Sequence, residues 1–281
     1  MSVRLGGHGL PVGPDDPAAF ARAHRDFGYG AAYCPELSLA DAPRLRAVEA
    51  AFKAENVTIA EYGIWRNLTA IEPDRKKAHR DRAKECLAVA DEVGCLCAVS
   101  YIGTFAPNSD YAPHPDNMGQ KAFDACVEAA RDIIDSVKPK RAKFALEMMQ
   151  YALPDSIDSY LDLLKAIDRP AFGVHVDPVN LIMTPRRYFD NGAYITEIFD
   201  RLGPWIVSCH AKDIILHHQA ALHLDECQIG EGVLDYKAFL RAIAKLGRDV
   251  PLMLEHLDGP AYAVARDRIQ AVAKAEGIAL T

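Results

Sequence analysis

The sequence lacks several features that mark special classes of protein. No apolar run in its 281 residues reaches the roughly 18 that a membrane span requires. The opening segment, residues 1–8, has no long apolar stretch of the kind found in signal peptides. The formal net charge of −7 leaves no excess of basic residues for a broad nucleic-acid-binding surface. We therefore expect a soluble, cytoplasmic protein without membrane or nucleic-acid partners.

The cysteines form neither a disulfide framework nor a zinc motif. There are seven, an odd number, and most stand among apolar residues. Cys95 and Cys97 are separated by one residue, which is not the spacing of a zinc knuckle. These residues are therefore expected to be reduced thiols in the core, as is usual in the cytoplasm.

The chain alternates short apolar runs with longer amphipathic segments, eight of each. A run of this kind predicts a buried strand, and an amphipathic segment predicts a helix packed on it. The pattern predicts an α/β fold, a (β/α)8 TIM barrel, as one domain over residues 1–281. A doubly wound sheet is the alternative, but Gly6-Gly-His-Gly9 is too short and irregular for its glycine-rich turn. The expected strands are 3–8, 31–34, 57–64, 95–101, 143–149, 173–177, 206–212 and 251–256, and the expected helices are 17–27, 41–55, 73–93, 119–137, 156–168, 193–202, 236–246 and 262–276.

Polar residues end the last four expected strands. Along Gly173–Asn180, His175 and Asp177 share one face of the strand, which breaks at Pro178. Catalytic groups of a barrel lie at the carboxyl ends of its strands, and adjacent strands bring those ends together. The four strand ends carry Glu147, Asp177, His210 and Glu255.

Three carboxylates converging on one mouth would repel each other unless a cation lay between them. Carboxylates with one imidazole suit a divalent ion, Mn²⁺ first, with Mg²⁺ or Co²⁺ as alternatives. Such an ion would act as a Lewis acid. A buried ion-pair network with Lys212 and His175 is the other interpretation, although it would leave excess negative charge.

The sequence resembles the sugar-phosphate isomerase/epimerase superfamily, the xylose-isomerase-like barrels. Relatives in that group include ketose 3-epimerases, hydroxypyruvate isomerase and the keto-inositol dehydratases. The resemblance covers roughly residues 143–256, and the first half of the chain matches only in its alternation of strands and helices. The matching motifs are Ala145-Leu-Glu147, Val174-His-Val-Asp-Pro-Val-Asn180, Val207-Ser-Cys-His-Ala-Lys-Asp213, Gln228-Ile-Gly-Glu-Gly-Val-Leu-Asp-Tyr236 and Leu252-Met-Leu-Glu255.

The resemblance implies a metal-dependent isomerase or epimerase that acts on a small keto-sugar or related polyhydroxy carbonyl. The family's metal ligands fall on Glu147, Asp177, His210 and Glu255. One of the two glutamates would remove a proton beside the carbonyl, giving an enediolate, and the other would return it. Loss of a β-substituent from the same intermediate would instead make the enzyme a lyase or dehydratase. Some relatives of that kind work with a small partner subunit, and the sequence leaves a homo-oligomer equally open.

Differences from the family pattern narrow the range of activities that we expect. Ketose 3-epimerases carry a histidine where this chain has Asn180, and a glutamate where it has Leu153. A strict ketohexose 3-epimerase is therefore not expected, and Asn180 becomes a candidate for substrate choice. An endonuclease IV-like nuclease would need further histidines, whereas the matching positions hold Glu61, Tyr101 and Glu226. A sugar-binding barrel without activity is the remaining class, and the intact quartet argues against it.

Other residues are candidates for supporting roles. His175 is a candidate acid/base or a group that holds a ligand, and Lys212 is a candidate partner of a substrate oxygen. His8 and Glu61 stand at the ends of the first and third expected strands and are candidates for lining the pocket. Trp65 and Tyr101 are candidates for stacking against a sugar.

Overall fold

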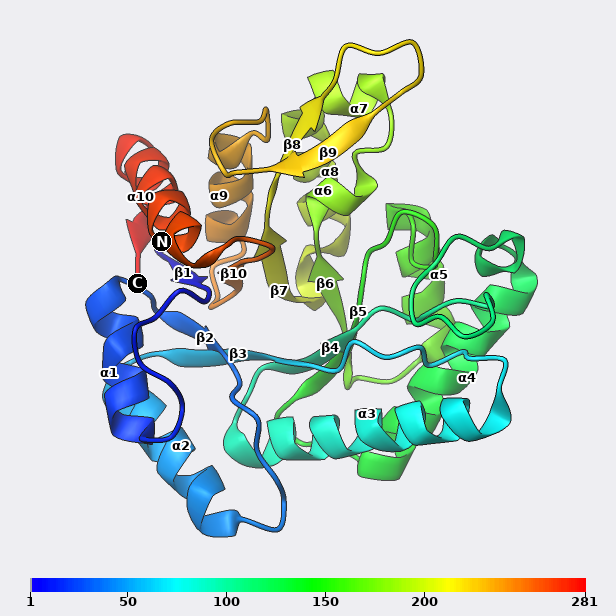
Figure 1. Ribbon diagram of the computed structural model, residues 1–281, viewed down its shortest axis with the longest axis horizontal. Helices are drawn as coiled ribbons and strands as arrows, with labels where there is room; N and C mark the ends of the chain where they lie inside the picture. The colour runs from blue at the N-terminus through cyan, green and yellow to red at the C-terminus, as the bar shows by residue number, and fades with distance from the viewer. Residues whose placement is uncertain (1) are drawn as a thin grey trace.

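The computed structural model of the protein describes residues 2–281 and forms a closed, parallel (β/α)8 barrel (Figure 1). Each barrel strand pairs with the next along the chain, and β10 closes the wall by pairing with β1, Leu252 opposite Leu5. The predicted fold class is confirmed. The barrel strands are β1 (Ser2–Gly6), β2 (Ala31–Tyr33), β3 (Thr58–Gly63), β4 (Cys97–Ser100), β5 (Lys143–Glu147), β6 (Phe172–Val176), β7 (Ile206–Ala211) and β10 (Pro251–Leu254).

Helices cover the outside of the barrel, and their ends follow local capping chemistry. Asp16 caps α1 by accepting from two backbone N–H groups, Pro17 fills the first turn, and Gly28 ends the helix in the left-handed conformation. The α-helices are α1 (Pro17–Phe27), α2 (Ala42–Ala54), α3 (Pro73–Val93), α4 (Gln120–Val137), α5 (Ile157–Ile167), α6 (Pro178–Leu181), α7 (Pro185–Phe189), α8 (Asn191–Leu202), α9 (Tyr236–Lys245) and α10 (Gly259–Ala275), and the 3-10 helices are η1 (Pro115–Met118) and η2 (Gly203–Trp205).

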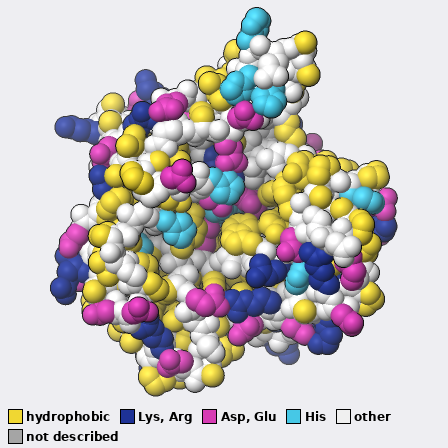
Figure 2. All heavy atoms as spheres, in the orientation of Figure 1, with side chains coloured by type: hydrophobic (Ala, Val, Ile, Leu, Met, Phe, Trp, Pro, Cys, Tyr) yellow, Lys and Arg dark blue, Asp and Glu magenta, His cyan; other side chains and the backbone are white. Residues whose placement is uncertain are grey.

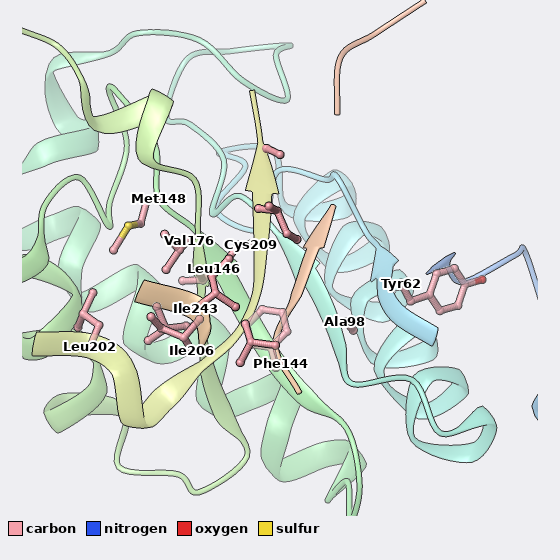
Figure 3. Packing of buried hydrophobic residues seen from close by; sticks show 14 of the residues in the cluster. Tyr62, Ala98, Phe144, Leu146, Met148, Val176, Leu202, Ile206, Cys209 and Ile243 are labelled. Carbon is pink, nitrogen blue, oxygen red and sulfur yellow. The ribbon is translucent and has the colours of Figure 1, made fainter. Parts of the chain in front are cut away.

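The apolar core has two layers, because the side chains of a strand alternate between its two faces. The larger layer fills the space between wall and helices, where Phe144, Leu146 and Ile206 meet Leu202 and Ile243 (Figure 3). Smaller clusters, separate from that layer, alternate with it along the strands and fill the barrel interior. Their fully buried members are Ala31, Ala60, Met253, Cys97, Val99 and Ala145. These interior residues end below the mouth, where polar side chains begin.

The structure contains elements that the sequence pattern does not predict, among them the short helices α6 and α7 after β6. The segment 213–235, expected as a loop, contains an antiparallel hairpin of β8 (Asp213–Leu216) and β9 (Leu224–Cys227). A short strand, β11 (Ala279–Leu280), pairs with β1 beside Ser2 and Val3. No helix among the described residues is long and apolar enough to cross a membrane.

Candidate active site

Four predicted side chains meet at the carboxyl end of the barrel. Glu147 ends β5, Asp177 follows β6, His210 lies near the end of β7 and Glu255 follows β10. Each offers one ligand atom, and these atoms all lie within 4.8 Å of one another. We call these four residues the quartet. Figure 2 shows acidic and histidine side chains gathered in the central hollow of this face.

The quartet fits a cation in its donor atoms and in its unsatisfied oxygens. Asp177 Oδ2 and Glu255 Oε2 are buried and receive no well-formed hydrogen bond from residues 2–281. Lys212 Nζ lies only 2.8 Å and 2.9 Å from these oxygens, but the angles are not those of hydrogen bonds. Buried polar atoms left in this way are costly, and a bound ion would satisfy both. Three carboxylates and an imidazole are a suitable donor set for a divalent metal.

A buried carboxylate, Glu61, fixes the orientation of His210. Its Oε2 lies 3.0 Å from His210 Nε2 and its Oε1 lies 3.1 Å from His175 Nε2. Ser208 donates a third, short hydrogen bond to the same carboxylate. The other ring nitrogen, His210 Nδ1, therefore faces the quartet, 2.9 Å from both Glu147 Oε1 and Glu255 Oε2. A carboxylate behind a ligating histidine is the arrangement that sets its tautomer in metal sites.

Burial and neighbouring charges shift the pKa values of Glu61, His210 and Asp177 in different directions. Burial alone would raise the pKa of Glu61, but the facing His210 and His175 outweigh burial and hold that pKa well below its usual range. Burial opposes protonation of His210, yet Glu255 and Glu61 raise its pKa well above the ordinary value. Asp177 is fully buried, and burial raises the pKa of its carboxyl in spite of the nearby Lys212.

Lys212 remains cationic although it is almost completely buried. Burial would lower its pKa, but Asp177 and the other carboxylates around it raise the pKa above the ordinary value. A third contact joins its Nζ to Glu226 Oε1 at 3.4 Å. Lys212 therefore offsets part of the negative charge and places an ammonium group at the cavity wall.

A cavity of about 340 Å³ opens over the quartet. Its lining combines aromatic rings with polar side chains, among them Asn180, Lys212, Glu147 and Glu255. The cavity is lined by Trp65, Tyr101, Tyr111, Glu147, Met149, Gln150, Asn180, Lys212, Glu226, Glu255 and His256.

The position of Trp65 in the cavity lining depends on a tight local fit. Trp65 adopts a left-handed backbone conformation with φ of 46°. A Cβ on Gly63 would stand 2.2 Å from Trp65 Nε1, so glycine permits the indole to fold back over β3. The Trp65 ring centroid lies 5.9 Å from that of Tyr101 and 6.0 Å from that of His210.

Asn180 is held by a chain of amide hydrogen bonds. Its Nδ2 donates to the Met148 carbonyl, and its Oδ1 accepts from Gln150 Nε2 at 2.9 Å. Tyr111 in turn donates to Gln150 Oε1 at 2.6 Å. The position that departs from the ketose 3-epimerases therefore presents a fixed amide group at the cavity wall.

Three predicted residues lie outside this cavity. Glu61 and His175 are fully buried beneath it, and they act on His210 and not on the open space. His8 lines a neighbouring cavity of about 310 Å³, with its ring stacked 4.4 Å from that of Tyr33. Strand length explains the positions of Glu61 and His8. The strand β3 continues two residues past Glu61, and β1 ends two residues before His8. Contact of these three residues with a substrate stays a prediction.

The hairpin and the last loop add two charged residues that sequence reasoning did not place in the site. Glu226, on β9, lies 2.8 Å from His256 Nδ1, and both line the cavity. The hydrogen bond to Glu226 raises the pKa of His256 although burial opposes it. Gln150 and Tyr111 were missed as well, because they stand on loops that carry no periodic signal.

The chain belongs to the xylose isomerase-like TIM barrel family, whose model matches residues 18–275. The predicted superfamily is confirmed. Among curated proteins it is similar to 3-oxo-isoapionate decarboxylase from Pectobacterium atrosepticum, with 26% identity over 121 residues. That alignment covers 39% of this chain and 42% of the relative, so less than half of each protein is compared.

Solved structures confirm the fold over nearly the whole chain. D-psicose 3-epimerase from Clostridium cellulolyticum, solved with D-tagatose, superposes with a TM-score of 0.69 at 14% identity, covering 98% of both chains. A xylose isomerase-like barrel protein from Mycobacterium smegmatis, solved with magnesium, gives a TM-score of 0.65 at 17% identity, covering 98% of this chain and 97% of that one. At these identities the likeness extends to the fold alone.

Proposed function

We propose that the protein is a divalent-metal-dependent isomerase or epimerase of a small keto-sugar or related polyhydroxy carbonyl. The observation that carries the proposal is the convergence of Glu147, Asp177, His210 and Glu255 within 4.8 Å at the floor of a cavity. The volume of about 340 Å³ is at the lower end for small-molecule sites, which favours a compact substrate.

The metal, Mn²⁺ in our proposal with Mg²⁺ or Co²⁺ as alternatives, would polarise a substrate carbonyl when held by the quartet. Glu147 and Glu255 approach His210 Nδ1 from strands β5 and β10 and both border the cavity. A substrate carbon between them would meet one carboxylate on each face, so one removes the proton beside the carbonyl and the other returns it. Glu61 and His175 hold the imidazole in place during this exchange.

The residues that line the cavity offer two kinds of contact to a substrate. Trp65 and Tyr101 offer apolar faces for the C–H groups of a sugar. Lys212 offers an ammonium donor for hydroxyl or carbonyl oxygens, and Asn180, whose amide is held by Met148 and Gln150, helps to shape the cavity for the substrate. These groups orient the reacting carbon toward the two glutamates.

A lyase that forms the same kind of enolate intermediate is the second candidate. The similarity to a decarboxylase favours it, because loss of a carboxyl group leaves the same kind of enolate. The ammonium of Lys212 stands beside the quartet and would pair with a substrate carboxylate. A dehydratase would reach its enolate by proton removal, as the isomerase would, and would then lose a β-hydroxyl group.

The proposal extends to partners and location. The substrate is a small carbohydrate, and the net charge of −7 argues against a nucleic acid. We also propose a cytoplasmic protein, either a homo-oligomer or a barrel that works with a small partner subunit.

The experiment is isotope exchange on a panel of keto-sugars and keto-acids. Metal-stripped protein with Mn²⁺ restored in D₂O should place deuterium on the carbon next to the carbonyl of recovered sugar, and the chelated protein should not. A lyase would instead release carbon dioxide or give a conjugated carbonyl that absorbs in the ultraviolet. Exchange that survives chelation and Glu147→Gln would contradict both readings.

A further inference from the structure

The hairpin β8–β9 carries a second group of metal-type side chains, away from the quartet. In the hairpin Leu216 pairs with Leu224, and His217 N donates to the His223 carbonyl at 2.9 Å. His217 and His223 are thus directly opposite each other beyond the last strand pair. Asp225 follows His223 by two residues and so shares its face of the ribbon.

These three side chains already meet. Asp225 Oδ2 lies 3.1 Å from His217 Nε2 and 3.2 Å from His223 Nε2, and one ligand atom from each lies within 4.8 Å of the others. All three are between 40% and 52% exposed, so an ion from solvent can reach them.

The geometry matches the edges of a transition-metal coordination shell. Bonds of about 2.0–2.1 Å in a tetrahedron place neighbouring ligand atoms about 3.3 Å apart, close to the 3.1 Å and 3.2 Å between Asp225 Oδ2 and the two imidazole nitrogens. Two imidazoles and one carboxylate are a donor set of catalytic and transport zinc sites, with water completing the shell. We propose that His217, His223 and Asp225 bind Zn²⁺ or a similar transition-metal ion; we call this group the hairpin site.

The hairpin site lies on the opposite face of the ribbon from the cavity. Glu226, the residue after Asp225, points the other way and contacts Lys212 and His256 at the cavity wall. The base of the hairpin is fixed, because the Asp213 carboxylate accepts from the backbone N–H groups of Gly230, Gly232 and Leu234.

The far end of the hairpin has weaker support. Its strands have four residues each, and a two-stranded ribbon of that length is marginal by itself. An ion on His217, His223 and Asp225 would join the strands across residues 218–222. It would thereby fasten the wall that presents Glu226 to the cavity.

The test measures zinc bound per chain, by equilibrium dialysis of metal-stripped protein followed by elemental analysis. His217→Ala, His223→Ala and Asp225→Asn should each bind one zinc fewer than the wild type. His218→Ala removes an adjacent histidine outside the cluster and is the matched control, which should bind as much as the wild type. The quartet is intact in all of these variants, so its own zinc cancels from the comparison. Circular dichroism checks that each variant is folded.

A second measurement tests whether the bound ion stabilises the far end of the hairpin. Zinc should slow protease cleavage within residues 218–222 of the wild type and of His218→Ala, and should have no effect on His217→Ala. Zinc stoichiometry that is equal in all variants would overturn the hairpin site. An equal loss in His218→Ala would also overturn it, because the histidines would then bind without a defined cluster. Both readouts are independent of catalytic activity.

Discussion

Replacing Glu61 by glutamine tests whether this buried residue orients His210 for a metal. Glu61 is fully buried and is the acceptor for His210, His175 and Ser208. A glutamine of the same shape has only one accepting oxygen, so at least one histidine would face an NH₂ group. The imidazole of His210 would then lose the partner that directs Nδ1 toward the quartet.

The expected loss of metal affinity follows from substitutions of comparable residues, which hydrogen-bond to metal ligands in other proteins. Such substitutions weaken metal binding by about 10- to 100-fold, or about 1.4–2.7 kcal/mol. The buried donor left unsatisfied would also lower the free energy of unfolding of the metal-free protein by about 1–3 kcal/mol. Titration calorimetry with Mn²⁺ measures the first effect, and urea denaturation measures the second.

A surface glutamate provides the matched control. Glu197 pairs with Arg201 one helical turn away at 3.3 Å, and both are exposed. Glu197→Gln should change neither Mn²⁺ affinity nor stability by more than about 0.5 kcal/mol. If Glu61→Gln bound Mn²⁺ as tightly as the wild type and unfolded at the same urea concentration, the orienting role would be refuted.

Three further predictions concern charge, pH and packing. Lys212→Met removes the ammonium beside the quartet and should tighten Mn²⁺ binding at least about tenfold by calorimetry; weaker binding would contradict the electrostatic argument. Burial lowers the pKa of His24 to about 4, below the 6.5 of an exposed histidine, so its stabilisation is present above pH 6.5 and is lost as the pH falls toward 4. In His24→Gln, the loss of stability over that window should be smaller by about 3 kcal/mol in urea titrations, and an unchanged pH dependence would contradict the burial argument. Gly30→Ala would place a Cβ 2.0 Å from the Thr281 backbone and should destabilise the protein by about 2 kcal/mol, whereas Gly119→Ala, with open space around it, should change stability by no more than about 0.5 kcal/mol. Equal thermal midpoints for these two variants would contradict the packing of β11.

The barrel and the quartet could be predicted because both follow from local patterns. A period of two decides which face of a strand a side chain takes, and the strand order of a barrel makes the ends of β5, β6, β7 and β10 neighbours. Asp177 and His210 needed only those two rules. Trp65 and Tyr101 could also be predicted at the cavity, because each stands within two residues of the carboxyl end of a strand.

The other parts of the site could not be predicted from the sequence. They depend on how deep a residue lies in the barrel and on which distant segments pair with each other. Glu61 lies below the mouth of the barrel, since its Cα pairs with Cys97 at the start of β4. Nothing in the residues around it fixes that register. Glu226 reaches the cavity only because β8 and β9 pair, and the polar sequence of β9 has no apolar pattern to predict a strand. The two-residue strand β11 is likewise set by its contact with β1.

The most direct measurement of the central claim is the anomalous diffraction of a crystal soaked in Mn²⁺. The account predicts one strong peak in the quartet, about 2.0–2.3 Å from Nδ1 of His210 and from carboxylate oxygens of Glu147, Asp177 and Glu255. It also predicts that the Lys212 ammonium moves away from the oxygens it now approaches. A fully soaked crystal with no peak there, and with Lys212 still between Asp177 and Glu255, would show a buried ion-pair network and contradict the account.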